Sequence, residues 1–460
     1  MSVRHALSRS ILREYDIRGT VGKDLTKADA EAIGRSFGTM VAGAKGRSVC
    51  VGYDGRVSSP DLEAAVVAGL NSAGIDAICI GRGPTPMLYY ATRTLGADGG
   101  IMITGSHNPP DQNGFKMMIG TKSFYGADIQ RLGEIAAKGE VRSGQGRATK
   151  RPVFDAYLDQ LHAAFDGARP LAVAWDPGNG ATGEVVAELV RRLPGRHLLI
   201  NEKIDGTFPS HHPDPTVPEN LVELQQLVAR EKCDLGIAFD GDGDRIGVID
   251  GRGRILWGDQ IMVILAEDVL KARPGATIIA DVKASQVLFD EVARMGGTPL
   301  MWRTGHSLIK TKLAETGAPL AGEMSGHIFF ADRYYGFDDA IYAAVRLLGI
   351  VSRSAKSLAD RRDAIPTMIN TPELRFPVSA DRKFAVIDET KARLKGRGAD
   401  LVDIDGVRVM TEDGWWLLRA SNTQEVLVAR CEARTEAGLN RLKAALRAEL
   451  TASGVTPPAI

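Results

Sequence analysis

The sequence predicts an α/β protein built from several domains. At 460 residues the chain is too long for one hydrophobic core, because a domain usually spans roughly 100–200 residues. Short apolar segments of strand length alternate with segments of helical periodicity, which is typical of βαβ units with parallel or mixed sheets. One strand pattern also occurs three times. Together these observations favour repeated α/β domains.

The repeated pattern is a short apolar strand that ends in aspartate. It covers residues 49–54, 171–176 and 277–281, and each copy is followed by a polar or glycine-containing loop and then a helical pattern. Loops of this kind gather at the carboxyl edges of parallel strands, where open α/β sheets usually bind ligands. The repeat therefore predicts three related α/β domains.

The C-terminal part of the chain has a different pattern. After the turn-prone residues 365–367 it contains a polar strand-like segment at 413–419 and closes with a helical pattern at 439–450. This order predicts an α+β domain. Charged, proline-containing stretches at 150–152 and 273–274 are candidate linkers. The expected domains are residues 1–152, 153–254, 255–366 and 367–460.

Composition excludes several classes of protein. Apolar residues make up 44% of the chain and charged residues 25%, which excludes extensive disorder. The formal net charge is +0, so we expect neither a nucleic-acid partner nor a membrane surface. No apolar run reaches the ~20 residues of a membrane span, and none resembles a signal peptide. Four widely spaced cysteines without a CxxC pair predict reduced thiols in a cytoplasmic protein.

The first segment with candidate chemistry is Thr104–Pro110, which follows the apolar residues 101–103. Gly105 permits a tight turn after the strand, and a proline stops any helix. The Ser106 hydroxyl would then face outward, with His107 beside it to hydrogen-bond a phosphate or an oxyanion. The segment predicts a nucleophilic serine or, alternatively, a plain polar turn.

The second segment places three aspartates at alternate positions after an apolar strand. Asp240, Asp242 and Asp244 are separated by glycines, which let the backbone curl tightly enough to bring the carboxylates to one centre. Oxygen ligands of this kind suit Mg²⁺, particularly when a phosphate supplies a further ligand. Without a cation, three carboxylates behind a buried strand would repel one another.

Two other classes of protein site contain an acidic segment of this kind. An EF-hand calcium loop needs a glutamate at its twelfth position, where this chain has Gly251, so that interpretation fails. An aspartyl-phosphate enzyme of the haloacid dehalogenase type would use Asp240 as its nucleophile. Such enzymes commonly carry Thr or Val where Asp244 stands, so the pattern fits less well, but the alternative stays open.

Two further segments favour binding of a sugar phosphate. Residues 322–327 place Glu323, Ser325 and His327 between glycines, which suits hydrogen bonds to sugar hydroxyls or a plain turn. Residues 419–425, with Arg430 shortly after, combine guanidinium, hydroxyl and amide groups. These groups would bind a phosphate through charge-assisted and neutral hydrogen bonds, although a polar hairpin or a helix start would also use them.

These four segments, in this order, resemble the phosphoserine, metal, sugar and phosphate-binding loops of the α-D-phosphohexomutases, in particular the phosphomannomutase/phosphoglucomutase branch. Residues 14–19 and 113–116 also match that family, so the resemblance spans nearly the whole chain. It implies four domains around a central active-site cleft. The first three are related α/β sandwiches with mixed sheets, and the fourth is an α+β lid.

The resemblance also implies roles for individual residues. Ser106 is the phosphorylated nucleophile, and Mg²⁺ is held by Asp240, Asp242, Asp244 and the Ser106 phosphate. Around the serine lie Arg18, His107, Lys116 and Arg245, and the general acid or base is His306, Lys116 or His107. The sugar and its distal phosphate are bound by Tyr15, Lys283, Glu323, Ser325, His327, Arg419, Ser421, Asn422, Thr423 and Arg430.

The implied reaction interconverts hexose 1-phosphate and hexose 6-phosphate of mannose and/or glucose through hexose 1,6-bisphosphate. We expect a monomer whose partners are small hexose phosphates. Met324 resembles the residue of enzymes that act on mannose and glucose phosphates, whereas phosphoglucosamine mutases usually carry Gln there. Phosphoglucosamine mutase activity stays one alternative, and a catalytically silent sugar-phosphate sensor is a second. Many relatives have Ala where Gly105 stands, and we expect that exchange to be tolerated.

Overall fold

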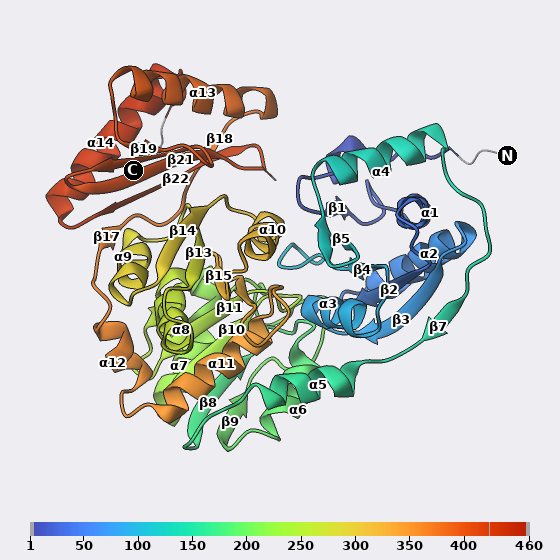
Figure 1. Cartoon of the computed structure of the whole chain (residues 1–460), viewed down its shortest axis with the longest axis horizontal. Coiled ribbons are helices and arrows are strands. Elements are labelled where there is room, and N and C mark those ends of the chain that lie inside the picture. Colours follow the sequence, from blue (N-terminus) through green and yellow to red (C-terminus); the bar gives the residue numbers. More distant parts are fainter. Residues whose placement is uncertain (1–3, 423, 457–460) are drawn as a thin grey trace.

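The computed structural model describes residues 4–422 and 424–456. Its strands form separate sheets of seven, five, four and six strands in chain order. In Figure 1 the first sheet and its helices lie on the right, the second and third lie together on the left, and the fourth lies above the third. The predicted α/β class with four domains is confirmed.

The first sheet has the strand order β1-β5-β4-β2-β3-β7, with β6 paired to β5. β2 runs parallel to β3 and β4, whereas β5 runs antiparallel to β1 and β4. The helices α1, α2 and α4 cover one face, and α3 packs against β2 and β4. The bounds are η1 (Arg9–Ile11), β1 (Ile17–Thr20), α1 (Lys27–Gly43), β2 (Ser48–Tyr53), α2 (Ser59–Ser72), β3 (Asp76–Arg82), α3 (Thr85–Thr94), β4 (Gly99–Ile103), β5 (Gln112–Ile119), β6 (Lys122–Phe124), α4 (Ala127–Lys138) and β7 (Ala148–Lys150).

The second sheet has the order β12-β11-β10-β8-β9, with β8 parallel to β9 and β10 and with β10 antiparallel to β11. Strand β10 is apolar and buried along its whole length, as expected for a strand covered on both faces. The bounds are α5 (Phe154–Ala163), β8 (Leu171–Asp176), α6 (Gly183–Val190), β9 (Gly195–Leu199), η2 (Pro218–Leu221), α7 (Val222–Glu231), β10 (Leu235–Phe239), β11 (Ile246–Asp250) and β12 (Ile255–Leu256).

The third sheet has the order β14-β13-β15-β16, with β13 parallel to β14 and β15 and with β15 antiparallel to β16. Each of the first three sheets thus has a central strand, β2, β8 or β13, between two parallel neighbours, and this common plan explains the repeat in the sequence. The bounds are α8 (Gly258–Ala272), β13 (Thr277–Asp281), α9 (Gln286–Arg294), β14 (Thr298–Trp302), α10 (His306–Thr316), β15 (Leu320–Gly322), β16 (Ile328–Phe330), α11 (Ala340–Arg353) and α12 (Leu358–Asp363).

The fourth sheet is antiparallel, with the order β17-β22-β21-β20-β19 and with β18 paired to β22. Helices α13 and α14 lie above it in Figure 1, away from the third sheet. The bounds are β17 (Ile369–Asn370), β18 (Leu374–Pro377), α13 (Ala380–Gly396), β19 (Leu401–Val402), β20 (Val407–Thr411), β21 (Gly414–Ala420), β22 (Val426–Ala433) and α14 (Glu436–Ala452). This is the predicted α+β domain.

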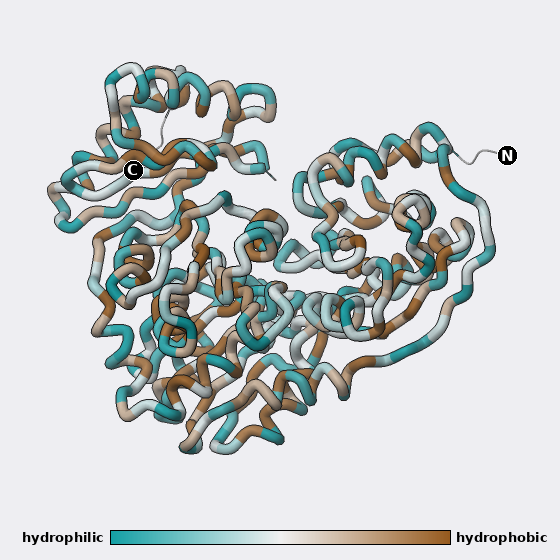
Figure 2. Tube along the Cα trace, viewed as in Figure 1, coloured by the Kyte–Doolittle hydropathy of each residue, from teal (hydrophilic) through white to brown (hydrophobic). Residues whose placement is uncertain are grey.

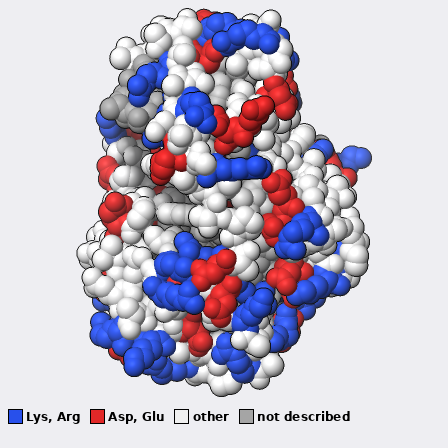
Figure 3. Space-filling model, turned by 90° about the vertical axis from the view of Figure 1, so that its left-hand side faces the viewer, with Lys and Arg blue, Asp and Glu red and all other residues white. Residues whose placement is uncertain are grey.

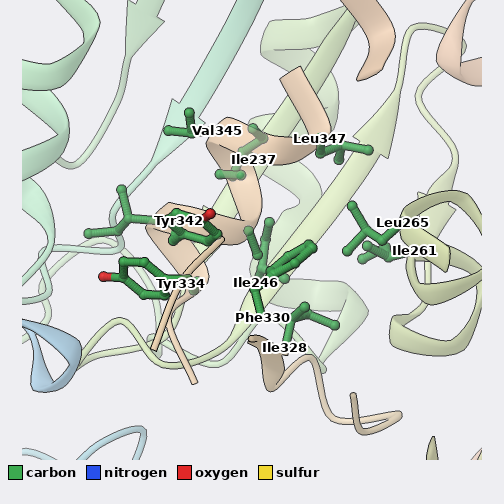
Figure 4. Packing of buried hydrophobic residues seen from close by; sticks show 14 of the residues in the cluster. Ile237, Ile246, Ile261, Leu265, Ile328, Phe330, Tyr334, Tyr342, Val345 and Leu347 are labelled. Carbon is green, nitrogen blue, oxygen red and sulfur yellow. The ribbon is translucent and has the colours of Figure 1, made fainter. Parts of the chain in front are cut away.

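One continuous core joins the second and third sheets. Helix α11 packs between them, so that Tyr342 and Val345 lie in one cluster with Ile237 of β10 and Phe330 of β16 (Figure 4). In Figure 2 the hydrophobic segments are concentrated in the inner strands and helices of this region, and the outer turns are hydrophilic. The two sheets therefore form one platform, against which the first and fourth domains are set.

The surface carries both signs of charge. On the face shown in Figure 3, Lys and Arg side chains lie beside Asp and Glu side chains in several places, between uncharged areas, in keeping with the formal net charge of +0. Within residues 4–422 and 424–456, no helix combines the length and the apolar character that crossing a membrane requires.

Candidate active site

All four domains contribute to one cleft of about 590 Å³. Its lining contains residues from the serine, sugar and phosphate-binding segments predicted from the sequence. The predicted site residues that line it are Tyr15, Arg18, Ser106, His107, Lys116, Arg245, Lys283, His306, Glu323, Ser325, His327, Arg419, Ser421, Asn422 and Arg430. Thr423 lies outside the described residues.

Ser106 lies at the base of this cleft, on the loop that follows β4. Its backbone is left-handed, with φ of 50°, and its N–H donates to Thr104 Oγ1 at 2.8 Å. The Ser106 hydroxyl donates to Asp240 Oδ2 at 2.8 Å, and His107 Nδ1 lies 3.1 Å from Ser106 Oγ. The strained loop therefore points the hydroxyl at the acidic segment of the second domain.

The aspartates Asp240, Asp242 and Asp244 lie beneath the cleft and are fully buried. Their carboxylate oxygens come within 4.8 Å of one another. Asp240 Oδ1 accepts three backbone N–H groups, from residues 243, 244 and 245, at 3.0–3.1 Å. Burial, together with the charges of the other two carboxylates, raises the pKa of Asp240 well above its ordinary value.

Lys116 partly neutralises this cluster. Its ammonium lies 2.8 Å from Asp242 Oδ2 and also pairs with Asp244. Burial lowers the pKa of Lys116, but the two carboxylates outweigh burial and raise it above the ordinary value. Among the described residues, no donor reaches Asp242 Oδ1 or Asp244 Oδ1. Orphaned, buried carboxylate oxygens of this kind fit a hard divalent cation.

A second group of possible metal ligands contains Asp244, His327 and Asp338. Arg245 Nε donates to His327 Nε2 at 3.0 Å, so a neutral imidazole carries its proton on Nδ1 and offers no lone pair there. His327 Nδ1 lies 3.1 Å from Asp338 Oδ2. With its proton on Nδ1, His327 faces the Asp338 carboxylate and has no lone pair there for a metal ion.

His306 and His107 are both held neutral. Burial and the nearby Lys310 ammonium lower the pKa of His306 well below its ordinary value, and burial together with Arg245 does the same for His107. His306 starts α10 directly after Gly305, whose φ is 136°. A β-carbon on Gly305 would lie 2.6 Å from the Tyr15 ring, so this position requires glycine.

The sugar segment is held by a hydrogen bond within the third domain, and the phosphate-binding segment is hydrogen-bonded to the first domain. Glu323 Oε1 accepts from the Gly305 N–H at 2.6 Å. Tyr15 Oη donates to the Thr304 carbonyl at 2.9 Å and accepts from Asn422 Nδ2 at 2.6 Å. Tyr15 of the first domain therefore contacts the third and fourth domains at once.

The fourth domain also contacts the loop that carries Lys283. Arg430 Nη1 donates to the Lys283 carbonyl at 2.6 Å, and the Lys283 ammonium pairs with Glu373 at 3.1 Å. Arg419 Nε donates to Asp405 at 3.0 Å. The cations expected to hold a phosphate are thus already matched with carboxylates or carbonyls.

The polar residues of this region that the sequence did not predict include Arg56, Asp338 and Glu373. Arg56 donates a hydrogen bond to the serine loop. Asp338 faces His306 and His327, and Glu373 lines the cleft. Each lies outside the motif-like segments. The strand-end pattern of residues 49–54 was the one signal near Arg56, and nothing in the sequence marked the other two.

Models of the phosphoglucomutase/phosphomannomutase family match most of the chain. The alpha/beta/alpha domain I matches residues 9–141, domain II matches 155–253, domain III matches 257–368, and the C-terminal domain matches 373–449. A crystal structure of a phosphoglucomutase/phosphomannomutase family protein from Burkholderia thailandensis superposes with a TM-score of 0.93 at 43% identity, covering 98% of this chain and 100% of that one.

Curated relatives agree over nearly the same length. Phosphomannomutase/phosphoglucomutase from Pseudomonas aeruginosa is 44% identical over 446 residues, or 97% of this chain and 96% of the relative. Phosphoglucomutase from Neisseria gonorrhoeae is 42% identical over 442 residues, or 95% of this chain and 96% of the relative. The chain therefore belongs to the phosphoglucomutase/phosphomannomutase family.

Proposed function

We propose that the chain is a phosphomannomutase/phosphoglucomutase, an isomerase that interconverts hexose 1-phosphate and hexose 6-phosphate of mannose and/or glucose. The observation that carries the proposal is the Ser106 hydroxyl, which lies at the base of a four-domain cleft and donates to Asp240 at 2.8 Å. A phosphorylated Ser106 would transfer its phosphoryl group to the free hydroxyl of a bound hexose monophosphate.

The first transfer breaks the bond between phosphorus and Ser106 Oγ and forms a bond to the sugar oxygen. The proton of the attacking sugar hydroxyl passes to a basic side chain near it, for which His306 and His107 are candidates, and the departing Ser106 Oγ takes up a proton. Lys116 is not suited to be this base, because the two carboxylates that pair with it outweigh burial and raise its pKa. The product is a hexose 1,6-bisphosphate. This intermediate then reorients in the cleft and transfers its other phosphoryl group to Ser106. The opposite hexose monophosphate remains.

The cation that fits the three aspartates is Mg²⁺, which Asp240, Asp242 and Asp244 would hold together with the phosphorylated Ser106. Bound there, it would offset negative charge on the transferring phosphoryl oxygens. The chain supplies further positive charge itself, because Lys116 is paired with two of the carboxylates and Arg18 Nη1 donates to the Gly105 carbonyl at 2.5 Å.

The distal site must accept either phosphate, since the intermediate presents both ends in turn. Arg419, Ser421, Asn422, Thr423 and Arg430 are proposed to bind it, and Lys283, Glu323, Ser325, His327 and Tyr15 to bind the sugar. A substrate phosphate would compete with Asp405 for Arg419 and with Glu373 for Lys283. After this exchange Glu373 would keep its pair with Arg375, and Asp405 would still accept the Thr304 N–H.

Asp240 is less suited to be the nucleophile of an aspartyl-phosphate enzyme. Its Oδ1 accepts three backbone N–H groups and its Oδ2 accepts the Ser106 hydroxyl. The side chain is buried below the cleft, so an incoming phosphate would meet Ser106 before it met the carboxylate. These contacts support the serine as the phosphoryl carrier.

The test is ³¹P NMR of the purified enzyme with Mg²⁺ and a trace of glucose 1,6-bisphosphate. We expect glucose 1-phosphate and mannose 1-phosphate to be converted to the 6-phosphates much faster than glucosamine 1-phosphate. Preference for the amino sugar would identify a phosphoglucosamine mutase. Binding without turnover of any of the three would identify a sugar-phosphate sensor.

The domain boundaries at 152, 254 and 366, a monomeric state and a cytoplasmic location stay predictions. Limited proteolysis and light scattering of the purified protein would test the first two.

A further inference from the structure

Arg56 is a fully buried arginine enclosed by the serine loop. It follows β2 closely, and its guanidinium donates to four main-chain carbonyls of one loop. Nη2 donates to Ser106 O at 2.8 Å and to Asn108 O at 2.6 Å. Nη1 donates to Pro109 O at 2.6 Å and to Gln112 O at 2.9 Å. Among the described residues, Arg56 alone donates hydrogen bonds to all four of these carbonyls.

The loop leaves room for this guanidinium because residue 105 is glycine. A β-carbon on Gly105 would lie 2.3 Å from Arg56 Nε and 2.4 Å from its Cζ. These distances are far below van der Waals contact. We expected alanine to be tolerated at residue 105, but the guanidinium occupies the space that its methyl group would need. An alanine here would therefore require Arg56 to move.

Asp54 fixes the arginine and the loop together. Its Oδ2 accepts the Gly105 N–H at 3.1 Å and lies 3.3 Å from Arg56 Nε. Its Oδ1 accepts the Arg56 N–H at 3.0 Å and the Ser59 hydroxyl at 2.6 Å. The end of the central strand β2, the arginine and the serine loop thus form one hydrogen-bonded unit.

Arg56 also contacts the domain that holds the aspartates. Its guanidinium lies 5.0 Å from the centre of the Phe208 ring, and a β-carbon on Gly206 would lie 2.6 Å from Arg56 Cα. Arg56 does not line the cleft, so it is not placed to bind substrate. It links the loop that carries Ser106 to the domain that carries Asp240.

We propose that Arg56 is a positioning residue for phosphoryl transfer. By donating hydrogen bonds to the four carbonyls of the serine loop, it holds Ser106 Oγ in line with the three aspartates. The inference rests on the proposed function. A planar guanidinium can donate to four carbonyls at fixed angles, whereas the ammonium of lysine is a point charge with three donors. Charge alone therefore does not replace Arg56.

The test compares Arg56→Lys and Arg56→Ala with Arg346→Lys in the full-length enzyme. Arg346, on α11, is equally buried, and its ion-pair partners, Asp332 and Asp268, lie outside the serine loop. We expect Arg56→Lys to lower kcat about 100-fold, the loss typical of a small misplacement of a reacting group, with KM changed by less than about 3-fold. Arg346→Lys should lower Tm but keep the kcat of the folded enzyme. Added guanidine should partly restore Arg56→Ala.

Unchanged kcat in Arg56→Lys, or an equal loss in Arg346→Lys at the same fall in Tm, would overturn the proposal. If neither Arg56 variant folds, Gly105→Ala gives the test instead, because it displaces the guanidinium while keeping every side-chain charge. We then expect the same loss of kcat, and wild-type kcat would overturn the proposal. Absence of phosphate on Ser106 in the active wild-type enzyme would contradict the proposed function itself and not the contacts of Arg56.

Discussion

The hydroxyl of Ser106 donates a 2.8 Å hydrogen bond to Asp240, a residue 134 positions later in the chain. This bond joins the serine loop of the first sheet to the acidic loop of the second. Because the two loops leave the ends of equivalent strands, β4 and β10, the common plan of the two domains brings the Ser106 hydroxyl and the three aspartates together.

Replacing Lys116 with methionine should destabilise the protein as well as inactivate it. The ammonium is buried and pairs with Asp242 and Asp244, so its removal leaves two buried carboxylates uncompensated. We expect a loss of about 3–5 kcal/mol in the free energy of unfolding without metal, measured by urea denaturation. Lys271→Met removes an exposed pair with Glu267 and should change stability by less than about 1 kcal/mol. Equal effects of the two variants would contradict this account of the charge cluster.

Removing divalent metal should abolish turnover and lower stability together. The free oxygens of Asp242 and Asp244 predict that Mg²⁺ at about 100 times its dissociation constant adds about 2.7 kcal/mol to the free energy of unfolding. Differential scanning calorimetry with EDTA and then with excess Mg²⁺ measures this shift. Asp242→Asn should abolish the shift, whereas the exposed Asp159→Asn should retain it. A Tm that does not respond to Mg²⁺ in the wild-type protein would argue against a metal site here.

Asp339 should make stability depend on pH. It caps α11 and accepts hydrogen bonds from the Tyr157 and Tyr334 hydroxyls, and burial raises its pKa from 3.8 to about 6. A raised carboxyl pKa means that the folded state favours the protonated form. The stability that Asp339 contributes is therefore fully present below about pH 4 and is lost as the pH rises through about 6.

Urea denaturation of the wild type and of Asp339→Asn between pH 4 and pH 7 tests this dependence. As the pH rises, the unfolding free energy of the wild type should fall by up to about 3 kcal/mol relative to that of Asp339→Asn. A difference that stays constant over this range would show that the carboxyl titrates normally.

Tyr15→Phe should loosen closure of the fourth domain. The hydroxyl donates to Thr304 and accepts from Asn422, and each such bond contributes about 1 kcal/mol. We expect KM to rise up to about 10-fold and the radius of gyration in small-angle scattering to increase. Tyr90→Phe removes an interdomain hydrogen bond to Ala156 away from the cleft and is the matched control. Identical KM values for the two variants would be inconsistent with a closure role for Tyr15.

Much of the fold was predictable because it is repeated. The strands expected at 49–54, 171–176 and 277–281 correspond to β2, β8 and β13, since each is an apolar run that ends at a buried aspartate. Asp54 and Asp281 then bind N–H groups of neighbouring loops, at Gly105 and Met324. The local pattern therefore also marked which loops would meet at the sheet edges.

The rest depended on contacts between distant parts of the chain. Asp338 faces His306 and His327 only because β16 and α10 lie side by side around it, and no local spacing encodes that arrangement. Arg56 was overlooked because an arginine after a strand is usually solvated. Its burial follows from the glycine at 105, whose importance is visible only once the side chains are placed.

Peptide mass spectrometry of the active enzyme tests the central claim most directly. A phosphoryl group on the Ser106 peptide, lost on incubation with excess hexose monophosphate and restored by glucose 1,6-bisphosphate, is the predicted result. Phosphate on the peptide that contains Asp240, labile to hydroxylamine, would contradict the serine mechanism, and so would turnover without phosphate on either peptide.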